Sequence, residues 1–298
     1  MPFPVFDNIH QQTLTDNLLS EKGIEVNVLR LDKLHPVING NKWFKLKPYL
    51  QDAIENGFDT VASFGGAWSN HIIALAHAGK ELQLKTVGFI RGEEPANWSY
   101  TLLAAKEAGM QLIFLSRKEF DDEKSIREIF RANHWYWISE GGYGMKGAEG
   151  AATILDGIKR DHTHIVCAVG TGTMMAGLIK AAAEHQIIIG MNVLKGNDSI
   201  AEEVNALLNV EERKKQFSFI NENHFGGYAK HPPELITFMQ DLKKQHDLPT
   251  DIVYTSKMMY GLLELIKKDF FAAGSKVLAI HSGGLQGNLS LPTGVLSF

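Results

Sequence analysis

The feature that most constrains this chain is a repeated alternation of short apolar runs with segments of helical spacing. Between residues 60 and 132 the runs TVASFGG, KTVGFIRG and MQLIFLS are each followed by such a segment. The alternation resumes after residue 145, with THIVCAVG, QIIIGMNV and KVLAIHSGG as the clearest strand candidates. Strands that alternate with helices form parallel sheets whose faces are covered. The sequence therefore predicts an α/β protein with two doubly wound, mainly parallel-sheet domains.

Glycine and asparagine residues mark where the helical segments end. The pattern predicts helices over about residues 44–56, 69–78, 97–108, 118–132, 146–160, 173–185, 198–208, 232–245 and 257–273. An alternating strand over residues 24–31 precedes the turn-rich tripeptide Asn-Gly-Asn at 39–41. Lys42 follows that turn and lies just ahead of the first predicted helix.

Composition excludes several classes of protein. The 298 residues suffice for two domains, and a net charge of −4 provides no field that would attract nucleic acid. The single cysteine, Cys167, excludes an intramolecular disulfide and fits a reducing compartment. No apolar run approaches the roughly 20 residues of a membrane span, and the first residues lack signal-peptide character. We therefore expect a cytoplasmic protein that binds neither membrane nor nucleic acid. The 12 histidines lack metal-ligand spacing, so we expect no metal.

A glycine-rich loop between a buried strand and a helix is the clearest binding element, Gly170-Thr171-Gly172-Thr173. Glycine lets the backbone approach a ligand closely, and the start of the helix offers free N–H groups to an anion. No Gly-Lys-Ser/Thr follows, and Met175 stands where a dinucleotide fingerprint has its third glycine. The loop therefore predicts a site for a single phosphate group, with a tight structural turn as the alternative.

Two further stretches place polar side chains at special positions. Ser69, Asn70 and His71 follow a glycine-rich strand end, which is more polarity than an N-cap at Ser69 alone requires. Lys42 follows a tight turn, and a lysine used in covalent chemistry must be both fixed and partly desolvated. The alternative for the lysine stretch is a solvated helix face, because three lysines occur within six residues.

These stretches occur in a fixed order along nearly the whole chain: Asn41-Lys42, Gly65-Gly66 with Ser69-Asn70-His71, Glu140-Gly-Gly, Gly170-Thr-Gly-Thr173, Gly226-Gly-Tyr228, Tyr254-Thr255-x-Lys257 and His281-Ser-Gly-Gly284. Together they resemble the tryptophan-synthase-β-like, fold type II pyridoxal-phosphate enzymes. Within that class the match is to the 1-aminocyclopropane-1-carboxylate deaminase and D-cysteine desulfhydrase family. The resemblance implies pyridoxal 5'-phosphate as cofactor, a homodimer, and a cofactor site in the cleft between two domains. Residues 1–47 and 140–298 would form the large domain and residues 48–139 a smaller inserted one.

The resemblance also implies roles for individual residues. Lys42 would be the Schiff-base lysine and the base for the α-proton, and Gly170–Thr173 would hold the cofactor's phosphate. Asn70 would also hydrogen-bond the cofactor's phenolic oxygen. The substrate would contact Ser69, Asn70, His71 and Tyr228, and the catalytic group would comprise Lys42, Ser69, Tyr228 and Tyr254.

One position separates the two branches of the family. The deaminase branch has a glutamate after the second tyrosine, near the pyridine nitrogen, where this chain has Thr255. The desulfhydrase branch is similar to this chain there and also near Ser282. A hydroxyl of Thr255 or Ser282 beside that nitrogen would leave it unprotonated and make the ring a weaker electron sink. The alternative is that these hydroxyls only cap local turns.

We therefore expect a lyase that acts on a small amino acid. The best match is β-elimination from D-cysteine, or a similar β-substituted D-amino acid, to pyruvate and ammonia. One alternative is 1-aminocyclopropane-1-carboxylate deamination, which Thr255 disfavours. Another is a non-catalytic small-molecule-binding relative. A nucleotide-dependent enzyme is disfavoured by the incomplete glycine fingerprint.

Overall fold

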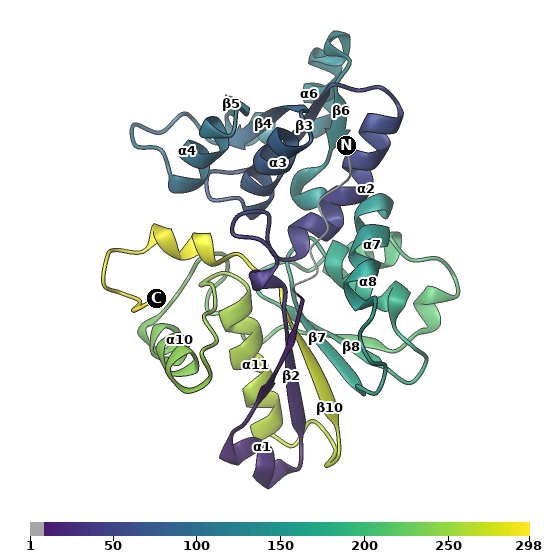
Figure 1. Ribbon diagram of the computed structural model, residues 1–298, viewed down its shortest axis with the longest axis vertical. Coiled ribbons are helices and arrows are strands. Elements are labelled where there is room, and N and C mark those ends of the chain that lie inside the picture. Colours follow the sequence, from purple (N-terminus) through teal and green to yellow (C-terminus); the bar gives the residue numbers. More distant parts are fainter. Residues whose placement is uncertain (1–8) are drawn as a thin grey trace.

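The computed structural model describes residues 9–298, which form two lobes, each built on its own sheet (Figure 1). The larger sheet has the order β1 (Gln11–Leu14), β2 (Glu25–Arg30), β10 (Lys276–His281), β7 (His164–Val169), β8 (Ile187–Asn192), β9 (Phe217–Ile220). Only β1 pairs antiparallel, with β2. The early strand β2 therefore lies beside the last strand, β10.

The smaller sheet is fully parallel. Its order is β5 (Gln111–Leu115), β4 (Lys85–Arg91), β3 (Thr60–Gly66), β6 (Tyr136–Ile138). The prediction of two doubly wound, mainly parallel sheets is confirmed. The short strands β1 and β6 were not predicted, because four and three residues are too few to show a period of two.

The helices are α1 (Asn17–Lys22), α2 (Asn41–Glu55), α3 (Asn70–Glu81), α4 (Tyr100–Glu107), α5 (Arg117–Phe120), α6 (Glu123–Ile129), α7 (Met145–Ala152), α8 (Thr173–Ala181), α9 (Ile200–Ala206), α10 (Pro233–His246) and α11 (Thr255–Lys267). The prediction of one helix over 118–132 is wrong. Ser116 and Glu119 form a capping box for α5, and Asp122 then caps α6 by accepting a hydrogen bond from Ser125 N. The helix predicted over 146–160 ends already at Ala152.

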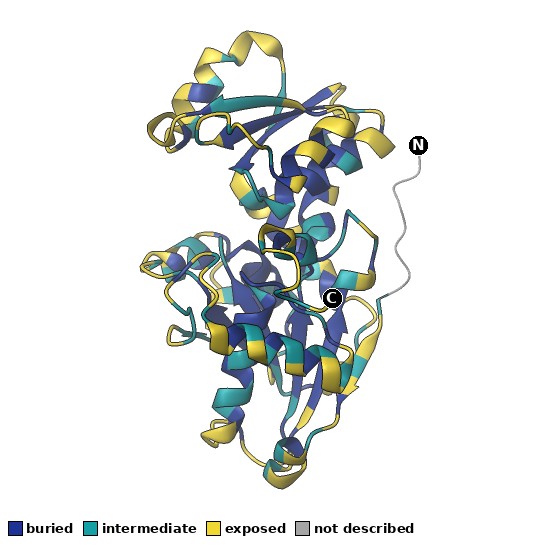
Figure 2. Cartoon of the chain, turned by 90° about the vertical axis from the view of Figure 1, so that its left-hand side faces the viewer, coloured by how far each residue is buried: buried dark blue, intermediate teal, exposed yellow. Residues whose placement is uncertain are grey.

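Strand β7 shows how the larger sheet is buried on both faces. Ile165 and Val169 pack into the cluster under α7, α8 and α9, while Val166 and Ala168 pack into the cluster under α1 and α11. Cys167 shares the first of these faces, and its complete burial raises the pKa of the thiol to about 12. Figure 2 shows that the central strands are mostly buried, while the helices are partly exposed. Cys167 is therefore an inert core residue.

Helix α2 runs between the two lobes. Its apolar side chains Trp43, Leu46 and Leu50 pack into the core of the smaller lobe. Pro48 lies inside the helix and has no N–H to donate to the carbonyl of Phe44. Gly150 of α7 packs against that carbonyl, since a Cβ at Gly150 would lie 2.1 Å from Phe44 O. The predicted domain limits of 48 and 139 stay a prediction.

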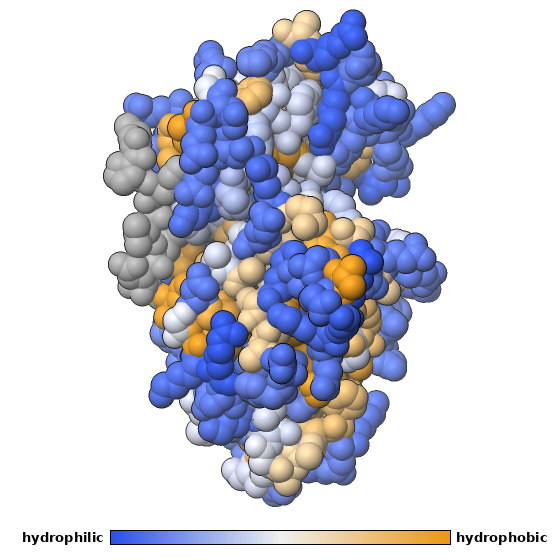
Figure 3. Space-filling model, turned by 90° about the vertical axis from the view of Figure 1, so that its right-hand side faces the viewer, coloured by the Kyte–Doolittle hydropathy of each residue, from blue (hydrophilic) through white to orange (hydrophobic). Residues whose placement is uncertain are grey.

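The surface differs between the lobes. The face in Figure 3 is mainly hydrophilic over the smaller lobe, while apolar residues gather over the larger one. Within residues 9–298, no helix combines the length and apolar character that crossing a membrane requires.

Candidate active site

The predicted motifs meet where the carboxyl ends of strands from both sheets face each other. Strand β3 leads into the start of α3, β7 leads into the Gly170–Gly172 loop and α8, and β10 leads into the Ser282–Gly284 loop. In open α/β sheets, ligands bind beyond the carboxyl ends of the strands. The topology thus brings together segments that are far apart in sequence.

The turn before Lys42 is joined directly to the Ser282–Gly284 loop. The N–H of Asn41 donates to the carbonyl of Ser282 over 3.2 Å. The backbones pack so closely that a Cβ at Gly40 would lie 1.9 Å from this same oxygen. On the other side, a Cβ at Gly283 would lie 2.5 Å from Asn39 Oδ1. Any side chain at Gly40 or Gly283 would separate the two segments.

Lys42 lies in the first turn of α2, which begins at Asn41 and not after Lys42 as predicted. Its Nζ donates to Asn41 Oδ1 over 3.1 Å and lies 5.9 Å from the centre of the Tyr254 ring. Burial lowers the pKa of Lys42 to about 8, against the opposing charge of Asp251. No carboxylate of residues 9–298 forms an ion pair with it, so a useful fraction of the amine is neutral near physiological pH.

Lys45 is a second amine at this site, which the sequence reasoning missed, and it is buried where Lys42 is half-buried. It lies three residues after Lys42, on the same helix face, and is only 2% exposed. Burial, and then the charge of Lys42, holds the pKa of Lys45 well below its ordinary value. The part of the chain that the structure describes provides it with no ion pair. The solvated-face alternative therefore holds for Lys47, which is exposed, and is wrong for Lys45.

The Gly170–Thr173 loop has the geometry of an anion site. Gly172 has a φ of 73° and starts α8, and no described side chain caps the first turn. The N–H groups of that turn are therefore open to a ligand. The hydroxyls of Thr171 and Thr173 lie 3.0 Å apart. The positive helix end and the two hydroxyls can together hold one phosphate group.

The pair Gly141-Gly142 places Lys45 near this loop. A Cβ at Gly141 would lie 3.0 Å from a carbon of Thr171, and one at Gly142 would lie 3.4 Å from Cβ of Lys45. Both glycines have positive φ, so the chain turns tightly between the two contacts. Lys45 therefore places an amine on the side of the junction that carries the anion loop.

Ser69 and Asn70 begin α3 at the junction. Ser69 caps the helix by accepting a hydrogen bond from Ile72 N over 3.3 Å. Asn70 Oδ1 accepts one from Gln286 Nε2 over 2.6 Å, which joins α3 to the segment after Ser282. The substrate contacts expected for Ser69 and Asn70 stay predictions, since both side chains also make these structural bonds.

His71 lies deeper than predicted. It is 1% exposed, with Nε2 at 2.8 Å from Ser63 Oγ, and Nδ1 has no hydrogen-bond partner among the described residues. Burial, and then the charges of Lys45 and Lys42, lowers the pKa of His71 well below its ordinary value. The ring is neutral, and its unpaired nitrogen is available to a buried ligand. Direct contact of His71 with a substrate stays a prediction.

Thr255 and Asp251 form a closed turn at the start of α11. The Thr255 hydroxyl donates to Asp251 Oδ1 over 2.6 Å and accepts the Asp251 N–H over 2.8 Å. Asp251 accepts four hydrogen bonds, all from Val253, Tyr254 and Thr255. Sequence reasoning missed Asp251, although an aspartate four residues ahead of a threonine at a helix start is a capping signal. The Ser282 hydroxyl makes no hydrogen bond to any described residue.

The two predicted tyrosines differ in their surroundings. A Cβ at Gly170 would lie 3.1 Å from the Tyr254 ring, so this ring borders the anion loop. Burial, followed by the nearby Tyr228 and Asp251, raises the pKa of Tyr254, which keeps its hydroxyl protonated. Tyr228 is 54% exposed. A protonated Tyr254 can orient a ligand, whereas Lys42 is far better suited to accept a proton.

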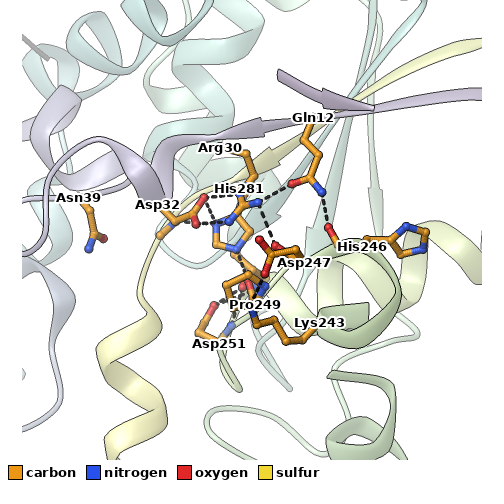
Figure 4. Close-up of polar contacts among 12 residues, drawn as sticks. Gln12, Arg30, Asp32, Asn39, Lys243, His246, Asp247, Pro249, Asp251 and His281 are labelled. Atoms are coloured by element: carbon orange, nitrogen blue, oxygen red, sulfur yellow. Dashed lines mark hydrogen bonds and ion pairs between the residues drawn. The ribbon is translucent and has the colours of Figure 1, made fainter. Parts of the chain in front are cut away.

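A buried ion network supports this region from the larger sheet (Figure 4). Arg30 donates to both oxygens of Asp32, over 2.8 and 2.6 Å. His281 Nδ1 lies 3.2 Å from Asp32 Oδ1, and its Nε2 lies 2.7 Å from Pro249 O. Burial favours the neutral acid, but Arg30 and His281 outweigh it and lower the pKa of Asp32. The network fixes His281, and with it the start of the Ser282–Gly284 loop.

Two other features do not belong to this site. A groove of about 710 Å³ beside α6 and β6 is lined by Arg127, Trp135 and Trp137 among others, and by none of the predicted site residues. Among residues 9–298, no group of histidine, cysteine, aspartate or glutamate side chains could hold a metal ion.

The unpaired groups at the junction suit a phosphorylated carbonyl compound. The open first turn of α8 and the buried Lys45 can hold the phosphate, and a partly neutral Lys42 can attack a carbonyl. The fold and the site are therefore those of a two-lobed α/β enzyme suited to such a cofactor.

Comparisons with known proteins identify the family. The family model described as "Pyridoxal-phosphate dependent enzyme" matches residues 11–283, and the chain belongs to that family. A Pyrococcus abyssi protein named "Putative 1-aminocyclopropane-1-carboxylate deaminase" is 32% identical over 292 residues, which cover 90% of this chain and 86% of the relative. An Arabidopsis thaliana protein named "Bifunctional D-cysteine desulfhydrase/1-aminocyclopropane-1-carboxylate deaminase, mitochondrial" is 27% identical, with 89% and 73% covered. A crystal structure described as that of an ACC deaminase homologue has a TM-score of 0.81 at 26% identity, with 96% and 91% covered.

The family expected from the motifs is thus confirmed. The chain is a pyridoxal-phosphate-dependent enzyme with the fold type II arrangement, and pyridoxal phosphate is its cofactor.

Proposed function

We propose that this enzyme is a lyase that eliminates the β-substituent of D-cysteine or a similar β-substituted D-amino acid. With D-cysteine and water, the products would be pyruvate, ammonia and hydrogen sulfide. The observation that carries the proposal is the chemistry of the groups after β10 and before α11. Asp251 accepts four hydrogen bonds from its own turn, and the Thr255 hydroxyl is bound to it. The Ser282 hydroxyl makes no such bond with any described residue, so it is the proposed partner of the pyridine nitrogen.

A hydroxyl partner favours reactions with an easy leaving group. When bound, pyridoxal phosphate withdraws electrons from the substrate's α-carbon, and it does so most strongly when a carboxylate keeps the ring protonated. A thiolate leaves readily from the β-carbon and requires less of this withdrawal. Opening a cyclopropane ring requires stronger electron withdrawal by the cofactor. The neighbourhood of Ser282 and Thr255 thus supports β-elimination.

The protein's own groups have the following proposed roles. Lys42 accepts the α-proton, because its pKa of about 8 leaves a useful neutral fraction. The first turn of α8, with Lys45, holds the phosphate. Ser69 and Asn70 bind the substrate, and Asn70 also orients the cofactor. Tyr228 and Tyr254 border the reacting groups.

The test compares substrates on the purified, cofactor-loaded enzyme. The reaction with D-cysteine is monitored by the release of pyruvate and sulfide. We expect its kcat/KM to exceed that for 1-aminocyclopropane-1-carboxylate by at least about 100-fold, as for other differences in transition-state fit. L-cysteine serves as the stereochemical control. Faster release of 2-oxobutanoate from 1-aminocyclopropane-1-carboxylate would overturn the proposal.

The second candidate function is 1-aminocyclopropane-1-carboxylate deamination, which the name of the Pyrococcus abyssi relative favours. Thr255→Glu offers a direct comparison, because it restores the residue type of the deaminase branch. Under the lyase proposal, Thr255→Glu should lose activity on D-cysteine. Its rate on 1-aminocyclopropane-1-carboxylate should not reach the rate of the wild-type enzyme on D-cysteine.

The homodimer, the cytoplasmic location and the domain limits at residues 48 and 139 remain part of the proposal. Sedimentation of the cofactor-loaded enzyme tests the first, and cell fractionation tests the second. Limited proteolysis tests the domain limits, since cleavage sites concentrate in exposed segments between domains.

A further inference from the structure

The segment Phe225–Ala229, which carries Tyr228, has an unusual backbone. Four of its five residues have positive φ: Phe225 at 51°, Gly226 at 90°, Gly227 at 110° and Ala229 at 52°. Such angles are unfavourable for residues with a side chain, so Phe225 and Ala229 adopt them only if surrounding contacts hold them. The loop must therefore be fixed by something outside itself.

Lys257 of α11 provides that support. It is 0% exposed, and its Nζ donates to the carbonyl of His224 over 2.9 Å and to that of Gly227 over 2.5 Å. Both carbonyls also accept bonds within the segment, since Gly227 N donates to His224 O over 2.9 Å and Lys230 N donates to Gly227 O over 3.2 Å. Lys257 forms no ion pair with any described residue, so these two carbonyls are its recorded hydrogen-bond partners.

Neighbouring contacts fix the same segment from other sides. The Phe225 ring meets the Tyr260 ring of α11 edge to face, with centroids 4.9 Å apart. A Cβ at Gly227 would lie 3.1 Å from Cβ of Lys195, so the backbone is enclosed there too. A methionine at position 257 would fill the same space without the hydrogen bonds. The buried ammonium is therefore explained by the two carbonyls and not by packing alone.

We propose that Lys257 is a positioning residue that holds the Phe225–Ala229 segment so that Tyr228 faces the reacting groups. The inference rests on the proposed function for the role of Tyr228, but the hold on the segment itself does not. Tyr228 belongs to this segment, and Lys257, which holds it, lies two residues after Thr255 at the start of the same helix, α11. Loss of the lysine would free the segment and leave Lys42 and the anion loop intact.

Hydrogen–deuterium exchange of the cofactor-loaded enzyme without substrate measures the hold directly. In Lys257→Met we expect exchange in residues 224–230 to rise at least about tenfold, as the loss of charge-assisted hydrogen bonds predicts. Exchange in β7 and β10 should stay unchanged. Lys257→Arg should retain protection, and Lys268→Met, at an exposed lysine just after α11, is the matched control. Unchanged exchange in 224–230 of folded Lys257→Met would overturn the proposal.

Kinetics on the best substrate then connect the segment to Tyr228. Lys257→Met should lower kcat/KM about tenfold, and the double variant with Tyr228→Ala should be no slower than Tyr228→Ala alone. Additive losses would show that Lys257 acts independently of Tyr228. If Lys257→Met fails to fold, Lys257→Gln replaces it in both measurements. Absence of D-cysteine turnover would refute the proposed function, whereas the exchange result would still decide whether Lys257 holds the segment.

Discussion

The Arg30–Asp32–His281 network and the Lys42–Lys45 pair both bring ionisable groups to the junction, but only the first is neutralised within the protein. In the network, every buried charge contacts an opposite charge or a carbonyl, and exposure is 3% or less throughout. In the pair, burial lowers the pKa of both amines, the charge of Lys42 lowers that of Lys45 further, and neither amine forms an ion pair with a carboxylate of the described chain.

The difference distinguishes charged groups that stabilise the fold from groups that are available to bind a ligand. A buried ion costs free energy unless it is paired, so the network is stable by itself. The two lysines remain uncompensated until an anion and a carbonyl group arrive. Under the proposed function, the cofactor would offset this cost, because its phosphate would supply negative charge and its carbonyl would be a covalent partner for Lys42. Removing charge from the two regions should therefore have opposite effects.

The largest expected effect is on catalysis at the pair. Lys42→Ala removes the proposed base and the covalent hold on the cofactor, so kcat should fall at least about 1,000-fold. Steady-state turnover measures the loss, and peptide mapping after borohydride reduction should locate the cofactor on Lys42 in the parent enzyme only. Lys47→Ala, at an exposed position of the same helix, is the control and should keep its activity. Retained turnover in Lys42→Ala would contradict the assignment.

The next effect is on stability at the network. Asp32→Asn keeps the shape of the side chain but leaves Arg30 and His281 buried without their carboxylate. The free energy of unfolding should fall by about 3–5 kcal/mol, the usual cost of breaking a buried pair. Urea denaturation measures it. Asp59→Asn is the control, because the Asp59–Lys85 pair is exposed and should contribute little to stability. Equal losses in the two variants would show that the network is not a structural support.

Lys45→Met should act in the opposite direction on the protein without cofactor. It removes a buried amine that has no carboxylate partner among the described residues, so the free energy of unfolding should stay equal or rise. Cofactor affinity should fall about 10- to 100-fold, because one charge-assisted bond to the phosphate is lost. Equilibrium binding of pyridoxal phosphate checks the second effect, and Lys47→Met should change neither quantity. A loss of stability like that of Asp32→Asn would instead make Lys45 a structural charge.

Much of the fold followed from local sequence. Buried strands such as β7 consist of continuous β-branched and apolar residues, and Gly79 and Gly109 marked helix ends to within a few residues. Errors arose where short-range signals competed. The helix predicted over 118–132 is interrupted because the Asp122 side chain caps a new helix. In a stretch rich in charged residues, such a capping aspartate cannot be recognised from the sequence.

The site was predicted only in part. Motifs at strand ends and at the turn before α2 predicted Asn70, the Gly170 loop and Lys42, because backbone requirements leave local signals. The structure places them at the junction, and their roles stay predictions. Lys45 and Asp251 were missed, since their meaning depends on burial and on partners from distant segments. A lysine in a lysine-rich stretch has the same sequence whether it faces solvent or a phosphate. The i, i+3 spacing from Lys42 was the one available signal.

The last predicted effect is a pH dependence, with no loss of function, that tests the state of the Lys42 amine itself. Below its pKa of about 8 the amine is mostly protonated and cannot attack a carbonyl, so capture of pyridoxal phosphate by the apoenzyme should accelerate about tenfold per pH unit. Above pH 8 the rate should level off, because the amine is already neutral. Stopped-flow absorbance between about pH 6 and pH 10 measures the profile, with Lys42→Ala showing no covalent capture. An ordinary solvated lysine, with a pKa near 10.5, would give a rate still rising at pH 10. That result would mean that the pair is not desolvated, and the contrast with the paired network would then disappear.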